Sequence, residues 1–155
     1  MKPGFTIIEL MITVVIGALL ITGAMVAYRG LGARQSVKQV GISFQTDLKS
    51  YQQKALTGTK PSACEASDTI EGYRISNVDN DTFSVVAVCG SGSPESIEFN
   101  LPEGVEFQAA FNPNDIFFPV LTAEVTGAQT IVLTKDNYRY QVIIEPSGVI
   151  RGQML

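Results

Sequence analysis

Residues 4–28 read GFTIIELMITVVIGALLITGAMVAY, and this stretch decides the organisation of the chain. The part from Leu10 to Tyr28 carries no charge. As a helix it covers about 28 Å, close to the ~30 Å hydrocarbon core of a bilayer. Small residues such as Gly17 and Gly23 permit close packing between neighbouring helices. The stretch therefore predicts one helix that lies in lipid or in the core of an assembly.

Two ordinary explanations of the apolar stretch are open at this point. It is a secretory signal cut near Thr22-Gly23-Ala24, where small residues stand at suitable places, or it is a simple signal anchor. Neither explains Glu9, because a carboxylate inside an apolar segment costs on the order of 2.5–3.5 kcal/mol to insert. Such an acid usually has a partner or a function.

The segment Gly4-Phe5-Thr6-Ile7-Ile8-Glu9-Leu10 resembles the processing motif of type IV prepilins and type II secretion pseudopilins. In that family a short basic leader ends in glycine. A membrane-embedded aspartic peptidase cuts after this glycine and methylates the new N-terminal residue. The resemblance implies that residues 1–4 are the leader, that cleavage falls between Gly4 and Phe5, and that Phe5 becomes N-methylated.

The resemblance also implies a role for Glu9. After cleavage the free amine of Phe5 would lie one helical turn before Glu9. In a bundle of parallel helices the carboxylate of one subunit can meet the amine of another, and pairing offsets much of the cost of burying either charge. The implied partners are other pilin or pseudopilin subunits, a prepilin peptidase, an inner-membrane assembly platform, and membrane lipid before assembly.

Residues 29–58 predict an amphipathic continuation of the helix. Gly30 and Gly32 are poor helix formers and are the expected places for a bend, whereas Gly58 and Pro61 are expected to end the helix. Apolar residues recur at spacings of three and four, which indicates one buried face. They are Val37, Val40, Phe44, Leu48, Tyr51 and Ala55.

From residue 61 to residue 155 the pattern changes to short strands. Pro119 places the run 116–121 at a sheet edge or in a loop. The other predicted strands are 71–76, 82–89, 96–101 with 104–107 as its continuation, 130–134, 138–145 and 149–151. The predicted fold class is α+β, with a long N-terminal helix packed on an antiparallel β head.

The C-terminal run resembles a subgroup of the same family, the H-type minor pseudopilins and T-type fimbrial minor pilins. The similar part is the hairpin 130–144 followed by Pro-Ser-Gly-Val-Ile-Arg at 146–151. Some T-type members bind DNA through a C-terminal basic motif, and Arg151 is the residue here that matches it. Lys135 and Arg139 of the preceding hairpin are the other candidates, and Val149 replaces the group's first arginine.

Charge is divided unevenly along the chain. Six basic and two acidic residues lie between positions 4 and 60, whereas four basic and thirteen acidic residues lie between 61 and 155. An acidic head argues against a general nucleic-acid surface, because Lys and Arg supply the affinity for phosphates. The chain has no His, and it shows no nucleophile–base set and no glycine-rich phosphate loop. We therefore predict no enzyme and no cofactor.

Cys64 and Cys89 are an even pair in a domain that the motif predicts to be exported. This favours a disulfide over a metal site, with two free thiols as the alternative. Asp79 and Asp81 flank Asn80 and offer oxygens that calcium would accept, but the same residues favour a β-turn. We predict the turn and no metal site.

Together with these patterns, the two resemblances imply a structural subunit, a minor pilin or minor pseudopilin, that crosses the bacterial inner membrane once before it enters a filament. Its head would then face the periplasm. Two alternatives stand beside this interpretation. One is a filament-associated module whose head binds DNA for uptake or a secreted substrate. The other is an unrelated membrane-anchored periplasmic domain.

Overall fold

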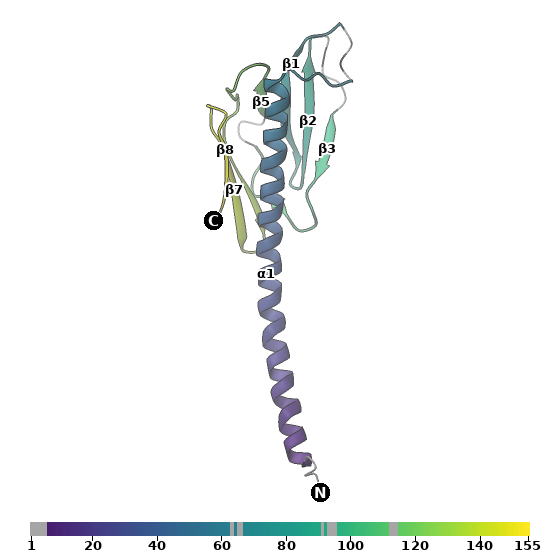
Figure 1. Ribbon diagram of the computed structural model, residues 1–155, viewed down its shortest axis with the longest axis vertical. Coiled ribbons are helices and arrows are strands. Elements are labelled where there is room, and N and C mark those ends of the chain that lie inside the picture. Colours follow the sequence, from purple (N-terminus) through teal and green to yellow (C-terminus); the bar gives the residue numbers. More distant parts are fainter. Residues whose placement is uncertain (1–5, 63, 65–66, 91, 93–95, 112–114) are drawn as a thin grey trace.

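The computed structural model describes residues 6–62, 64, 67–90, 92, 96–111 and 115–155, with the backbone alone between 22 and 30. One long helix, α1 (Ile7–Leu56), extends far beyond a β domain that flanks its C-terminal half (Figure 1). The helix is continuous through Gly30 and Gly32, where a bend was expected. The predicted α+β class with a long N-terminal helix is confirmed.

The C-terminal end of α1 is formed by a glycine cap. Gly58 adopts a φ of +62°, a conformation that favours glycine. Its N–H bonds to the Ala55 carbonyl, and the N–H of Thr59 bonds to the Lys54 carbonyl at 2.9 Å. This pair of bonds is the Schellman pattern, which satisfies carbonyls that the helix leaves open. The predicted stop at Gly58 is confirmed.

The head contains two four-stranded antiparallel sheets. Sheet A has the order β3-β2-β1-β5, and sheet B has the order β4-β6-β7-β8. In Figure 1, β1, β2 and β3 lie on one side of α1, and β7 and β8 lie on the other. The strands are β1 (Ile70–Asp79), β2 (Thr82–Cys89), β3 (Ile97–Asn100), β4 (Glu106–Phe107), β5 (Asp115–Pro119), β6 (Thr130–Lys135), β7 (Tyr138–Ile144) and β8 (Ile150–Met154).

One strand prediction is wrong. Residues 104–107 do not continue the third strand, because β4 pairs with β6 in the other sheet. The chain leaves sheet A through a turn in which the Val105 N–H bonds to the Pro102 carbonyl and Gly104 has a φ of +76°. Alternation of apolar residues does not reveal which sheet a short strand joins.

Pro119 predicted a sheet edge or a loop, and the structure shows the sheet edge. Pro119 is the last residue of β5, and β5 is an outer strand of sheet A. Proline lacks a backbone N–H, so an outer strand accommodates it without losing a bond from the interior of the sheet.

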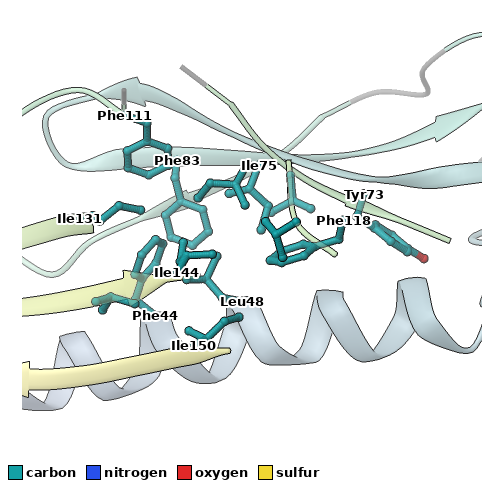
Figure 2. Close-up of a cluster of buried hydrophobic side chains, with 14 of the residues drawn as sticks. Phe44, Leu48, Tyr73, Ile75, Phe83, Phe111, Phe118, Ile131, Ile144 and Ile150 are labelled. Carbon is teal, nitrogen blue, oxygen red and sulfur yellow. The ribbon is translucent and has the colours of Figure 1, made fainter. Parts of the chain in front are cut away.

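The helix and both sheets share one hydrophobic core. Figure 2 shows Phe44 and Leu48 of α1 pointing toward side chains such as Ile75 and Phe83 of sheet A. The ring of Phe44 lies 5.1 Å from that of Phe83, edge to face. The predicted helix face is confirmed, with Tyr51 partly buried at its border. The buried members of that face are Val37, Val40, Phe44, Leu48 and Ala55.

Candidate assembly site

The start of α1 is capped by residues of the N-terminal motif. Thr6 has extended φ and ψ angles of −78° and 150°, and its hydroxyl accepts the backbone N–H of Glu9 at 3.3 Å. Its carbonyl accepts the N–H of Leu10 at 3.2 Å. Thr6 and Glu9 thus occupy the two positions of a capping-box sequence. The sequence interpretation missed the role of Thr6, although its Thr-x-x-Glu spacing was a sufficient signal.

Glu9 lies exposed in the first turn of α1. The positive end of the helix dipole favours an acid at this position. Gly4 and Phe5, the predicted cleavage site, lie outside the described residues. A cut between them would leave an amine one residue before the Thr6 cap, where the dipole disfavours a cation. The Glu9 carboxylate is the nearby charge of opposite sign that can offset this effect.

The first half of α1 has an apolar surface that the described part of the chain leaves uncovered. Large apolar side chains from Ile7 to Ile21 are 52% to 83% exposed. A helix that is apolar on all sides belongs inside an assembly or a membrane. Among the described residues, no helix combines the length and the hydropathy needed to cross a bilayer.

Residues 2–25 match the family model of the prokaryotic N-terminal methylation motif. The chain carries a prepilin-type processing signal. This motif is the cleavage signal of type IV pilins and pseudopilins, and it supports a membrane-anchored, pilin-like subunit that a prepilin peptidase processes. It points to a structural subunit rather than an enzyme. No curated protein and no solved structure matches the chain.

Cys64 and Cys89 are joined by a disulfide, as predicted. Their Cα atoms lie 6.1 Å apart, and both residues are buried. Cys89 is the last residue of β2, and Cys64 lies in the segment that follows α1. The bond therefore ties the exit of the helix to sheet A.

Asn80 and Asp81 connect β1 to β2 in the predicted turn, and Asp79 is the last residue of β1. The Asp79 carboxylate accepts the Asn80 N–H at 2.7 Å, and the Asp81 carboxylate accepts the Thr82 hydroxyl at 2.9 Å. Both acids therefore make bonds within the turn. The part of the chain that the structure describes contains no group of three or more residues able to hold a metal ion.

The structure separates the three cations considered for DNA. Arg139 and Arg151 lie on the outer face of sheet B, four positions apart in the register of β7, or roughly 13 Å. Lys135 faces the helix instead, where its amine donates to the Ser36 hydroxyl at 3.3 Å. Arg151 is paired with Glu145, which neutralises much of its charge. The three residues therefore do not form one basic patch.

Two glutamines of α1 hold the C-terminal strand. The side-chain amide of Gln45 donates to the Ile150 carbonyl at 3.1 Å, and that of Gln52 donates to the Gly148 carbonyl at 2.7 Å. The carbonyl between them, on Val149, accepts a backbone bond from the β7 side. Adjacent carbonyls of a strand point in opposite directions, so the glutamines cover the outer edge of sheet B where β8 begins.

Tyr140 of β7 fits between two glycines. A Cβ atom on Gly41 of α1 would lie 2.1 Å from the Tyr140 ring, and one on Gly152 of β8 would lie 2.3 Å from its hydroxyl. Burial raises the pKa of this hydroxyl. A glycine inside an amphipathic helix was the available signal for this close approach, and the sequence interpretation did not use it.

Proposed function

We propose that this chain is the precursor of a minor pilin or minor pseudopilin, a structural subunit of a type IV pilus or a type II secretion pseudopilus. The match of residues 2–25 to the methylation motif carries the proposal. Residues 1–4 are the leader and 5–28 are the membrane and filament-core helix. Residues 29–58 are its amphipathic continuation, and 61–155 are the extracytoplasmic head. The minor subtype rests on the C-terminal resemblance.

Before assembly, the apolar half of α1 anchors the chain once in the lipid of the inner membrane, with the head in the periplasm. An assembly platform then moves the subunit into the filament, where neighbouring helices replace lipid. The exposed apolar side chains between Ile7 and Ile21 support this exchange of one apolar environment for another. Glu9 pairs with the Phe5 amine of a neighbouring subunit, and the uncovered position of Glu9 supports such a contact.

Co-expression with a prepilin peptidase tests the processing step. Intact-mass measurement should show the loss of residues 1–4 and the gain of one methyl group on Phe5. A Gly4→Val variant should keep the full length, because a branched side chain replaces the glycine after which the enzyme cuts. A chain that starts at any residue other than Phe5 in cells with the active peptidase would exclude the proposed function.

A Glu9→Val variant tests the assembly step separately. It should be processed and inserted like the parent but reach sheared filaments at least about tenfold less. Removal of one partner of a buried charge pair costs about 3–5 kcal/mol, and a tenfold change needs only about 1.4 kcal/mol. Thr13→Val is the matched control, because Thr13 lies one turn further along the same exposed helix. Equal incorporation of both variants would show that Glu9 does not set assembly.

The alternative function is a binding module whose head contacts DNA for uptake or a secreted substrate. It rests on Arg139 and Arg151 on the outer face of sheet B. Retardation of a DNA duplex by the purified chain, lost in Arg151→Ala and retained in Lys135→Ala, would favour this alternative. The absence of retardation at low salt would exclude DNA as the ligand.

A further inference from the structure

The edge strands of the two sheets differ in how many of their outward backbone groups already have a partner. Gln45 binds the carbonyl of Ile150 at the start of β8, and Gln52 binds that of Gly148 just before the strand. The edge strand β5 exchanges both backbone bonds of Phe117 with Thr126. The edge strand β4 has only two residues. Strand β3 is four residues long, and Ile97 at its start is 58% exposed. Of the described edge strands, β3 is therefore the one most open to contact with a partner molecule.

A groove of about 360 Å³ lies between β3 and α1. Its apolar surface includes Val40 and Phe44 from α1, Phe83 from β2, and Phe99 and Leu101 from β3 and the residue after it. Gln39, Ser43, Asp47 and Asn100 add polar groups. The volume is in the range of sites that receive side chains or small ligands.

Asp47 is the charged residue of this groove. It is half-buried, and burial raises the pKa of its carboxyl. Within the described residues, no cationic side chain lies at ion-pair distance from it. The groove therefore offers an apolar surface and one acid whose charge has no counterpart among the described side chains.

Basic and apolar side chains that complement the groove lie closer to the N-terminus of the same helix. Leu31 is 61% exposed and Ile42 is 40% exposed, while Arg34 and Lys38 between them are also exposed. At about 100° per residue these four side chains fall on one stripe of α1. We call them the basic stripe. It offers two cations and two apolar groups where the groove offers an acid and apolar walls.

The basic stripe and the groove lie on different flanks of α1. At about 100° per residue, the stripe is rotated roughly 120° from the buried face on one side, and Gln39, Ser43 and Asp47 are rotated roughly 100° from it on the other. One chain therefore presents both halves of a contact that it cannot make with itself. Such a pair of surfaces joins copies head to tail and does not close a two-fold dimer.

The axial positions of the two surfaces also agree. A parallel copy displaced by nine residues, or about 14 Å, brings its Lys38 to the level of Asp47. The same displacement brings its Leu31 to the level of Val40, at the other end of the groove.

We propose that the groove between α1 and β3 receives the basic stripe of a second copy of this chain, with Lys38 of that copy paired with Asp47. This inference rests on the proposed function, since it describes a contact between subunits of one filament.

Site-directed crosslinking of the full chain tests the contact. Two copies with different C-terminal tags are expressed together with the prepilin peptidase and assembly machinery, one carrying Lys38→Cys and the other Asp47→Cys. A short bis-maleimide should join the differently tagged copies, while cells with only one of the two variants should give at least about fivefold less product. The native cysteines do not react because they form a disulfide.

Lys49→Cys paired with Asp47→Cys is the matched control. Lys49 is exposed on the same flank of α1 as Lys38 but lies about three turns closer to the C-terminus of the helix. In the proposed contact it is therefore too far from Asp47 of the neighbouring copy to be crosslinked. Equal crosslinking in this control, or a product formed only between identical variants, would overturn the head-to-tail contact. Loss of residues 1–4 is measured in the same samples. Correct processing without the specific crosslink therefore rejects the contact and leaves the proposed function intact.

Charge exchange supplies a second measurement that does not depend on cysteine. Lys38→Glu and Asp47→Lys should each lower the amount of chain in sheared filaments at least about threefold, and the double variant should recover at least half of the loss. Lys49→Glu and Glu124→Lys are the matched single controls, both at exposed positions outside the proposed contact. A double variant as poor as the worse single variant would contradict the pairing of Lys38 with Asp47.

Discussion

The two halves of α1 differ in what covers their apolar side chains. In the first half, the large apolar residues from Ile7 to Ile21 are all more than half exposed. In the second half, Val37, Phe44 and Leu48 are almost completely buried against the two sheets. One helix therefore contains a segment that the head covers and a segment that needs another molecule.

This difference reflects two kinds of hydrophobic pattern. The second half is apolar on one face only, so a single domain on that face satisfies it. The first half is apolar all round, and no domain on one side can cover it. Burial of apolar surface contributes roughly 25 cal/mol per Å², so lipid or neighbouring helices must supply this stabilisation. Folding of the head is thus expected to be independent of assembly, whereas the first half depends on it.

The largest predicted effect comes from a substitution in the second half of α1, which the head covers. Phe44→Ala should lower the free energy of unfolding of the head by about 3–5 kcal/mol, because it empties the centre of the core. Denaturant unfolding of the full chain in detergent, followed by near-UV circular dichroism, measures this change. Ile12→Ala in the exposed half is the control and should leave the midpoint unchanged. Equal losses would mean that the two halves do not differ as described.

The disulfide is expected to stabilise the head alone. Replacement of Cys64 and Cys89 by Ser together should lower the free energy of unfolding by about 3 kcal/mol, as expected for a bond across a separation of 25 residues. The same denaturant experiment measures this loss. Insertion of the chain into membranes should be unchanged. A variant that fails to insert would show that the bond also matters for the first half.

Two glycines of α1 give changes of opposite sign. Gly41→Ala should destabilise the head by about 1–3 kcal/mol, because the new methyl group meets the buried Tyr140 ring. Gly32→Ala meets no atom within 4 Å and should stabilise the helix by up to about 1 kcal/mol. Thermal unfolding of the two variants measures both. A neutral Gly41→Ala would show that the ring moves aside easily.

The smallest predicted effect depends on pH and concerns Asp47. Burial raises the pKa of its carboxyl above the ordinary 3.8, so the folded head favours the neutral form. The neutral carboxyl therefore makes the folded head more stable than the charged carboxylate does. This stability is fully present below the pKa of the unfolded chain and is lost as the pH rises through the pKa of the folded head. Asp47→Asn should therefore melt at a higher temperature than the parent near pH 7, with the difference closing as the pH falls toward 3.8.

Thermal unfolding of the unassembled chain at several pH values measures this difference. An Asn variant that is less stable than the parent near pH 7 would contradict burial as the dominant influence on Asp47. It would also indicate that the carboxylate already has a favourable partner within its own chain.

Local patterns predicted the parts of the fold that depend on neighbours in the sequence. The spacing from Val37 to Ala55 identified the buried helix face, Gly58 identified the helix end, and Pro119 limited its segment to a sheet edge or a loop. Each of these features is determined by the geometry of a few adjacent residues. The motif from Gly4 to Glu9 identified the processing signal for the same reason, since it is read as a continuous segment.

Other features depended on residues far apart in the chain. Residues 104–107 were assigned to the wrong strand because their pairing with β6 is decided about thirty residues later in the sequence. Lys135 was grouped with Arg139, yet strand alternation turns it toward Ser36 of α1. The role of Gln45 and Gln52 in holding β8 could not be seen from a helix pattern that places them outside its apolar face.

The sequence by itself determined the long helix, its two hydrophobic patterns, the processing signal and the antiparallel β head, because helix and strand periodicities and short motifs are local. Only the tertiary structure decided that the head has two sheets, that two glutamines of α1 cover the start of β8, and that a groove opens beside β3 around Asp47, which has no ion-pair partner among the described side chains. These features arise from contacts across long sequence separations, and many pairings are compatible with the same alternation of apolar residues. Packing against one helix selects among those pairings.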